Sequence, residues 1–199
     1  MQAGRRGARE RWNERRSTAG FEPFPDAPAE WLVEHAPLLR GGGWALDVAC
    51  GDGRNARLLA GLGYEVDAVD VSDVAIDALV ATAAERAPGV HPRVLDVERE
   101  PLPAREYDVV VDFFYLQRDL FPALERAVRP GGWLLFETFA RAHVEELGNR
   151  MNPDYVLGDN ELLHAFPALR VRHYREGVTE RPRGPRGLAS LLAQRPAAT

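Results

Sequence analysis

The fold of this chain is decided by the stretch Trp44-Ala45-Leu46-Asp47-Val48-Ala49-Cys50-Gly51-Asp52-Gly53-Arg54-Asn55-Ala56. Its apolar first half lies between two glycine-rich segments, and its second half opens a run of alanine and leucine residues. That order is typical of a β-strand, a tight loop and an α-helix. The stretch therefore predicts one half of a β-α-β unit.

The loop of this unit predicts a ligand site. Gly51 and Gly53 can adopt positive φ and carry no Cβ, so a ligand can come close to the backbone N–H groups. The helix that follows points its positive end at the same place. Taken alone, the spacing G-x-G-x-x-A also describes a dinucleotide site.

Two carboxylates narrow the choice of ligand. Asp47 lies inside the predicted strand, where a buried charge is costly unless a cationic or hydrogen-bonding partner compensates it. Asp70 closes the next apolar run, residues 64–69, where a carboxylate can accept both hydroxyls of a ribose. S-adenosylmethionine has a cationic amino-acid end and a ribose. Nicotinamide cofactors need a pyrophosphate contact and no acid before the glycines.

The chain resembles the class I S-adenosylmethionine-dependent methyltransferases, and more narrowly the branch related to the tellurite-resistance methyltransferases. The similarity runs from about Trp12 to the C-terminus. It is carried by residues 45–56, then by Ala68-Val69-Asp70-Val71-Ser72, Tyr107-Asp108-Val109-Val110-Val111, Arg129-Pro130-Gly131-Gly132 and Asn152-Pro153-Asp154-Tyr155-Val156-Leu157. The resemblance implies an α/β fold, a Rossmann-like doubly wound sheet of seven strands, mostly parallel with a C-terminal antiparallel hairpin.

The resemblance also implies a set of residues around S-adenosyl-L-methionine. Trp12 and Arg15 would belong to a lid over the cofactor mouth, although Arg16 stands where the family has an aromatic residue. Asp96 would bind the adenine amino group, with turn capping as its alternative role, and Val97 would offer a backbone N–H to the ring. The full set of expected cofactor-binding residues is Trp12, Arg15, Asp47, Ala49, Gly51, Gly53, Asn55, Asp70, Val71, Asp96, Val97, Asp112 and Phe113.

The remaining pattern predicts the order of elements and domains. We expect a flexible arginine-rich segment or lid over residues 1–20 and one methyltransferase domain over 21–199, with no repeat and no second domain. Within it the sequence predicts helices over 29–39, 54–62, 73–86, 119–128 and 161–166, and strands over 44–48, 64–69, 91–95, 107–111, 133–139, 169–177 and 187–194. Ser72 with Asp73, and Asp119, are the expected N-caps.

The methyl acceptor is expected at the end of the fourth strand. Residues 112–118 follow the most β-branched run of the chain, at the sheet edge where ligands of open α/β sheets collect. Tyr115, Arg118 and Glu137 are candidates for acceptor contacts or catalysis, and each has a structural role as its alternative. The arginines of residues 181–186 could contact an anionic acceptor or simply be solvated on a hairpin. The five histidines show no metal-ligand spacing and no catalytic triad, so we expect no metal and a soft chalcogen, thiol or other small nucleophile.

Composition sets broader limits. All 25 basic residues are arginine. Six of them lie in the first sixteen residues together with Glu10 and Glu14, which gives this segment a charge of +4. Because the net charge of the chain is −5, the remaining residues carry a charge of −9. An acidic body argues against a nucleic-acid groove, and no apolar run predicts a membrane span. The single cysteine agrees with a reducing compartment, so we expect a cytoplasmic protein. We also expect a monomer or homodimer with a small-molecule partner. Two alternative functions stay open: a catalytically silent S-adenosylmethionine-binding module, and a nicotinamide-dependent oxidoreductase.

Overall fold

The computed structural model describes residues 7–18, 26–39 and 41–197. At residues 84–86 it describes the backbone alone. The part of the 1–20 segment outside 7–18 lies beyond these residues. The elements are α1 (Ala8–Ser17), α2 (Glu30–His35), η1 (Ala36–Leu38), β1 (Gly43–Val48), α3 (Arg54–Gly61), β2 (Tyr64–Asp70), α4 (Asp73–Arg86), β3 (Val90–Val94), β4 (Tyr107–Phe113), η2 (Arg118–Leu120), α5 (Phe121–Ala127), β5 (Val128–Phe139), α6 (Ala142–Glu145), η3 (Pro153–Tyr155), α7 (Glu161–His164), β6 (Arg170–Thr179) and β7 (Arg186–Gln194).

One seven-stranded sheet organises the chain, with strand order β3-β2-β1-β4-β5-β7-β6. The pairs among β1 to β5 are parallel, whereas β7 runs antiparallel to both β5 and β6. This confirms the predicted doubly wound sheet with a C-terminal antiparallel hairpin. Because the order reverses between β1 and β4, the carboxyl ends of these strands are the place where open α/β sheets generally bind ligands.

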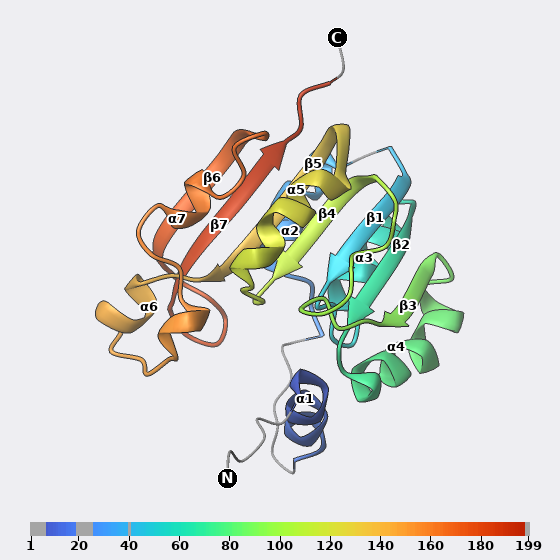
Figure 1. Cartoon of the computed structure of the whole chain (residues 1–199), viewed down its shortest axis with the longest axis horizontal. Helices are drawn as coiled ribbons and strands as arrows, with labels where there is room; N and C mark the ends of the chain where they lie inside the picture. Colours follow the sequence, from blue (N-terminus) through green and yellow to red (C-terminus); the bar gives the residue numbers. More distant parts are fainter. Residues whose placement is uncertain (1–6, 19–25, 40, 198–199) are drawn as a thin grey trace.

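Both faces of the sheet are covered (Figure 1). Apolar side chains of α2, α3 and α4 pack on one face, and those of α5 and α7 pack on the other. β4 contributes core residues to both faces. Val109 and Val111 pack with α2, α3 and α4, and Val110 packs with α5 and α7. The uninterrupted β-branched run of this strand is explained by that double burial.

Several element boundaries differ from the sequence prediction for local reasons. The expected helix over 29–39 ends at His35 and continues as a 3-10 turn that contains Pro37, which has no N–H to donate. Asp119 does not cap α5; it lies inside η2, and α5 begins with Pro122 in its first turn and no side-chain cap. Ser72 does cap α4, since its Oγ accepts from the Ala75 N–H at 3.2 Å.

Strand β5 begins at Val128 rather than at Trp133, because Val128 already pairs with Tyr107 before the register shifts. Gly131 adopts φ +80° within the irregular part. At the other end of the chain, α1 lies inside residues 1–20, the segment expected to be flexible or a lid. Within the described residues, no helix has the length and apolar content needed to traverse a membrane.

Candidate donor and acceptor site

The glycine loop sits at the reversal point of the sheet. Gly51 and Gly53 have φ +59° and +81°, and Gly53 is the N-cap residue of α3. Ala49, the residue that follows β1, also adopts a positive φ, of +52°. The loop therefore turns sharply from β1 into α3, as the sequence predicted.

Asp70 is held in place by this loop. Its Oδ2 accepts from the Gly51 N–H at 2.9 Å and its Oδ1 from the Ser72 N–H at 2.8 Å. Burial raises the pKa of Asp70, and the hydrogen bonds from Ser72 and Gly51 and the charge of Arg16 offset part of that rise. A carboxylate offers about four acceptor positions, so an oriented Asp70 retains positions for two hydroxyl groups.

Two further carboxylates are buried at the ends of neighbouring strands. Asp47 and Asp112 are each 1% exposed, in β1 and β4. Asp47 Oδ2 and both oxygens of Asp112 have no hydrogen-bond partner of acceptable geometry in the described part of the chain. Burying unpaired carboxylates is costly, and their presence indicates that a cationic or hydrogen-bonding group completes the site.

Their protonation follows from this burial. Burial raises the pKa of Asp47 to about 7, although Arg54 and the Ala56 N–H lower it. Burial, reinforced by the charge of Asp47, holds the pKa of Asp112 well above its ordinary range, and the nearby Tyr115 N–H opposes this only in part. Without a ligand, Asp47 and Asp112 together consequently carry less negative charge than two fully ionised carboxylates would.

Helix α1 lies beyond the carboxyl ends of the parallel strands (Figure 1). Asn13 fastens it to the start of α4, because Ser72 Oγ donates to Asn13 Oδ1 at 2.8 Å and Asn13 Nδ2 donates to Asp73 at 2.5 Å. A Cβ added to Gly51 would lie 2.8 Å from Arg16 Nη2. Helix α1 therefore lies against the start of α4 and close to the glycine loop.

Arg16 rather than Arg15 reaches the glycine loop. The Arg15 guanidinium instead lies 5.3 Å from the ring centroid of Trp12, which is 39% exposed. Sequence reasoning missed Arg16 and Asn13. The departure at Arg16 from the family's aromatic residue was the one signal that pointed to it.

The other expected donor residues have defined surroundings. Asp96 accepts from the Glu98 N–H at 3.2 Å and so has the turn role that was its alternative. Val97 is half-buried against the core, Phe113 is buried, and Val71 directly follows Asp70. Asn55 Oδ1 accepts from the Ala29 N–H at 2.9 Å and ties the start of α2 to the start of α3.

Of the acceptor-side candidates, Arg118 is engaged elsewhere. Its guanidinium donates to both carboxylate oxygens of Glu161, at 2.5 and 3.0 Å, and to the carbonyls of Asp154 and Val156. It therefore anchors residues 154–161. Tyr115 lies among acidic groups: burial and then the charges of Glu98, Asp112 and Asp96 raise the pKa of its hydroxyl. Neither side chain is placed to remove a proton from an acceptor at neutral pH.

Glu137 is buried at the carboxyl end of β5, and one of its oxygens accepts two hydrogen bonds. Its Oε2 receives hydrogen bonds from Arg181 Nη2 at 2.8 Å and Ser190 Oγ at 2.7 Å. Arg181 also pairs with Glu30. Burial raises the pKa of Glu137, while Arg181 and Ser190 lower it. This arrangement matches the structural alternative, in which Glu137 holds a neighbouring loop.

A cavity of about 220 Å³ is lined in part by Glu137 and by Arg54, the residue that follows Gly53. Arg54, the first residue of α3, is in its wall beside Phe114, which directly follows β4. The hairpin between β6 and β7 supplies the opposite wall. The complete lining is Ala27, Pro28, Ala29, Glu30, Arg54, Phe114, Glu137, Arg181, Pro182, Arg183 and Arg186. The arginines predicted as acceptor contacts or as a solvated hairpin thus line a cavity together with Arg54 and Phe114.

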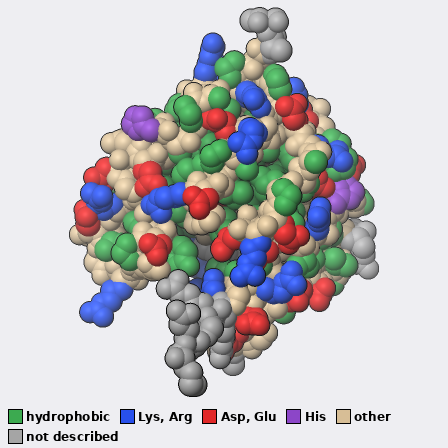
Figure 2. Space-filling view, in the orientation of Figure 1, with side chains coloured by type: hydrophobic (Ala, Val, Ile, Leu, Met, Phe, Trp, Pro, Cys, Tyr) green, Lys and Arg blue, Asp and Glu red, His purple; other side chains and the backbone are tan. Residues whose placement is uncertain are grey.

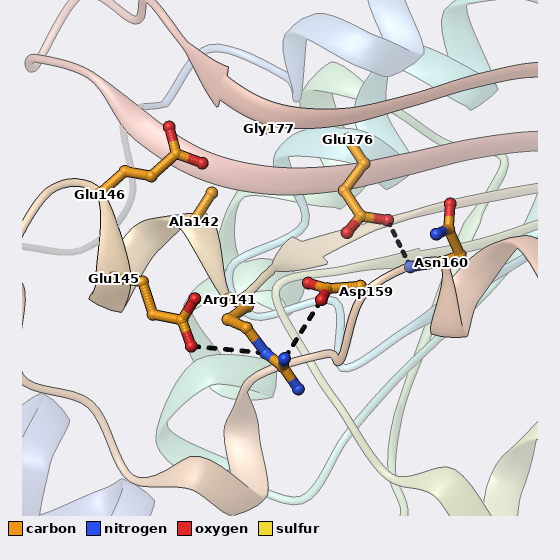
Figure 3. A pocket seen from close by; sticks show the side chains of 8 residues that line it. All are labelled: Arg141, Ala142, Glu145, Glu146, Asp159, Asn160, Glu176 and Gly177. Atoms are coloured by element: carbon orange, nitrogen blue, oxygen red, sulfur yellow. Dashed lines mark hydrogen bonds and ion pairs between the residues drawn. The ribbon is translucent and has the colours of Figure 1, made fainter.

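A second hollow, of about 310 Å³, lies on α6, the 159–160 turn and β6 (Figure 3). Its acids surround Arg141, which pairs with Asp159 at 3.1 Å and Glu145 at 3.6 Å, while Glu176 accepts from the Asn160 N–H at 3.0 Å. None of the glycine loop or the strand-end carboxylates lines it. Across the described residues, no group of three or more His, Cys, Asp or Glu could hold a metal ion.

The chain is similar to known proteins in this region. Residues 45–132 match a family model described as a methyltransferase domain. Ubiquinone biosynthesis O-methyltransferase of Burkholderia multivorans is 34% identical over 134 residues, which cover 62% of this chain and 56% of that protein. Its counterpart in Paraburkholderia phytofirmans is 35% identical over 120 residues, 56% and 50% of the two chains. This chain therefore spans about half the length of the curated relatives it matches.

Solved structures share the fold at low sequence identity. TehB from Haemophilus influenzae superposes with a TM-score of 0.73 at 18% identity and covers 94% of this chain and 67% of its own. The N-methyltransferase NodS from Bradyrhizobium japonicum, in complex with S-adenosyl-L-homocysteine, gives 0.66 at 15% identity over 94% and 98% of the two chains. These likenesses support the architecture that the strand order shows.

Proposed function

From the match of residues 45–132 to a methyltransferase domain, we propose that this chain is a class I S-adenosylmethionine-dependent methyltransferase, which binds S-adenosylmethionine at the glycine loop and transfers the methyl group to a small-molecule acceptor. The observation that carries the proposal is the set of unpartnered, buried carboxylate oxygens on Asp47 and Asp112 beside that loop. The sulfonium and ammonium groups of the donor carry positive charge, which would compensate these buried carboxylates.

The proposed donor contacts begin at the ribose and continue to the cationic end. Asp70, already oriented by two backbone N–H groups, would accept the ribose hydroxyls, and Gly51 and Gly53 would allow close approach of the donor. Asp47 and Asp112 would face its cationic end. The other donor contacts that we propose come from Trp12, Arg15, Ala49, Asn55, Val71, Asp96, Val97 and Phe113.

The bound donor supplies an activated methyl group, so the protein has to position an acceptor and exclude water. The cavity lined by Phe114 and Arg186 is the proposed acceptor site. Glu137 and Glu30 at this cavity are both paired with Arg181, and the remaining charged groups are guanidinium groups, which do not release a proton at neutral pH. An acceptor that is already ionised, such as a thiolate or another soft nucleophile, suits this site better than one that needs a base.

Two alternatives give different results in simple experiments. A silent S-adenosylmethionine-binding module would bind the donor and show no turnover with any acceptor. A nicotinamide-dependent oxidoreductase would bind NAD instead, and Asp47 argues against it. A nucleic-acid partner is also disfavoured, because acidic and arginine side chains are mixed on the face shown in Figure 2 rather than collected in a basic field.

Isothermal titration of the purified chain with S-adenosylmethionine and with NAD tests the proposal. We expect saturable binding of the first and none of the second. Asp70→Ala should weaken donor binding by about 2–3 kcal/mol, roughly 30- to 150-fold, since two hydrogen bonds to a carboxylate are lost. Asp77→Asn, at an exposed position of α4, is the matched control. Unchanged affinity in Asp70→Ala would contradict the proposed site.

A further inference from the structure

The sheet fixes the two buried carboxylates of the proposed donor site in place. Asp47 lies in β1 and is paired at this position with both β2 and β4, and Asp112 lies in β4 and is paired with both β1 and β5. Directly after β4, Phe114 turns the chain with a left-handed φ of +64°, and its N–H donates to the Glu137 carbonyl at 2.8 Å. Because the backbone is paired on both sides, neither carboxylate can swing out to solvent, and each is 1% exposed.

The surroundings of Asp47 compensate its charge only in part. Burial raises the pKa of Asp47 to about 7. The charge of Arg54 in α3 and the Ala56 N–H lower this pKa, whereas the charges of Asp70 at the end of β2 and Asp52 in the glycine loop raise it further. The charge of Arg54 is shared, since Asp52 and a carboxylate of β5 act on it as well as Asp47.

The surroundings of Asp112 compensate its charge still less. Among the described groups that act on it there is no cation: burial and then the charge of Asp47 hold its pKa well above the ordinary range, and the Tyr115 N–H opposes them. The Tyr115 hydroxyl and the Cys50 thiol also lie within the field of these carboxylates. Burial, first, and the neighbouring carboxylates raise the pKa of both groups, so both are neutral near pH 7. The proton balance of this part of the site therefore depends on the two aspartates.

Three of the four oxygens of these aspartates have no hydrogen-bond partner in the described part of the chain. Two neighbouring carboxylates that are shielded from water do not both ionise unless a cation joins them. We propose that Asp47 and Asp112 hold one proton between them in the free protein and release it to solvent when the sulfonium of S-adenosylmethionine enters the site. The proposal rests on the proposed methyltransferase function and concerns the regulation of its donor site.

This coupling distinguishes the donor from the product. In the transfer, a lone pair of the acceptor forms the bond to the methyl carbon, and the electron pair of the broken C–S bond stays on sulfur. The sulfonium thereby becomes the neutral thioether of S-adenosylhomocysteine, and the aspartate pair takes a proton back from solvent. At acidic pH the pair is protonated before the donor arrives, so the donor loses its advantage. Inhibition by S-adenosylhomocysteine is therefore expected to be strongest at acidic pH.

The number of protons released sets the pH dependence of donor binding. One released proton raises the affinity by up to about tenfold per pH unit below the range in which the free pair titrates. We expect about one proton for S-adenosylmethionine and almost none for S-adenosylhomocysteine. The ratio of their dissociation constants, product over donor, should consequently rise at least about fivefold between pH 5.5 and pH 6.5.

Isothermal titration of the full chain at pH 6.5 counts the protons. Each ligand is titrated in phosphate and in imidazole buffer, whose ionisation enthalpies differ, so the difference in observed heat gives the number of protons released. Both ligands have the same ribose and amino-acid end, and their difference therefore reports on the sulfonium. We expect S-adenosylmethionine to release at least about half a proton more than S-adenosylhomocysteine. Equal release by the two ligands, or proton uptake with S-adenosylmethionine, would overturn the proposal.

Variants assign the proton to the pair. Asparagine resembles the protonated acid in shape and cannot ionise, so Asp47→Asn combined with Asp112→Asn should make the two ligands release equal numbers of protons. The ratio of their dissociation constants should then no longer change with pH. Asp77→Asn, at an exposed position of α4, should keep the wild-type difference. An extra proton that is still released by S-adenosylmethionine from the double variant would refute the assignment.

An infrared measurement on the wild type depends neither on a variant nor on turnover. At pH 6.5 the C=O band of a protonated carboxyl group should lose intensity when S-adenosylmethionine is added and keep it with S-adenosylhomocysteine. A band that is unchanged by S-adenosylmethionine at saturation would overturn the proposal. Donor binding without extra proton release overturns this inference alone, whereas failure of S-adenosylmethionine to bind overturns the proposed function together with it.

Discussion

Replacing Asp47 with asparagine should stabilise the protein at alkaline pH. The carboxyl group is buried and one of its oxygens is unpartnered. Burial raises its pKa from 3.8 to about 7. Because the native state then holds the proton more tightly than the unfolded chain, the free energy of unfolding falls as the pH rises from about 4 to about 7.

The size of the effect follows from that shift. Each pKa unit corresponds to about 1.4 kcal/mol, so the full penalty above pH 7 is about 4 kcal/mol, and about 2 kcal/mol of it is present at pH 5. Asparagine does not ionise and can still accept from the Ala56 N–H. Its extra N–H hydrogen costs about 1–3 kcal/mol if left unpaired, at every pH. The change between pH 4.5 and pH 8 therefore isolates the charge.

The assay is equilibrium urea unfolding without donor, followed by the fluorescence of the four tryptophans, at pH 4.5, 6 and 8. The difference in unfolding free energy between Asp47→Asn and the wild type should shift by about 3 kcal/mol in favour of the variant from the lowest to the highest pH. Asp77→Asn should show no such trend. A pH-independent difference, or one that shifts against the variant, would refute the reasoning about this buried carboxylate.

Three further outcomes follow from packing. Gly53→Ala should destabilise the protein by about 2–4 kcal/mol in urea, because its Cβ would lie 2.3 Å from Leu79 Cδ1 at φ +81°, and Leu79→Ala added to it should recover part of the loss. Gly187→Ala would place a Cβ 1.9 Å from the backbone N of His143, and we expect a loss of about 3 kcal/mol and a lower thermal midpoint; an unchanged midpoint would contradict that contact. Arg118→Gln should cost about 1 kcal/mol or less because the ion pair is part-exposed, yet it should speed proteolysis within residues 154–161, and an unaltered cleavage pattern would argue against its anchoring role.

The donor half of the fold could be predicted because its signals are local. The run from Trp44 to Ala56 combines strand, loop and helix in thirteen consecutive residues, and the strand and helix bounds at β1, α3, β2 and α4 agree with the sequence within about two residues. Burial of β4 on both faces was likewise legible in its β-branched run. Each of these features depends on neighbours in sequence.

The acceptor side depends on residues that are distant in sequence. The pairing of Glu137 with Arg181 joins positions 44 residues apart, and the Arg118 clamp on Glu161 joins positions 43 apart. Nothing in the local pattern distinguishes these arginines from solvated ones. The left-handed backbone at Phe114 is equally hidden, because it follows from tertiary contacts rather than from the propensity of the residue.

The place of β7 between β5 and β6 has a consequence for biosynthesis. The two strands that it joins are made earlier, yet neither pairs with the other, so a nascent chain leaving the ribosome carries β5 with an open edge until residues 186–194 emerge. An unpaired strand edge is a template for wrong partners. Premature termination before residue 186 would therefore leave this edge open for good and remove the wall that bears Arg186, even though the nucleotide-facing half of the sheet had been translated in full.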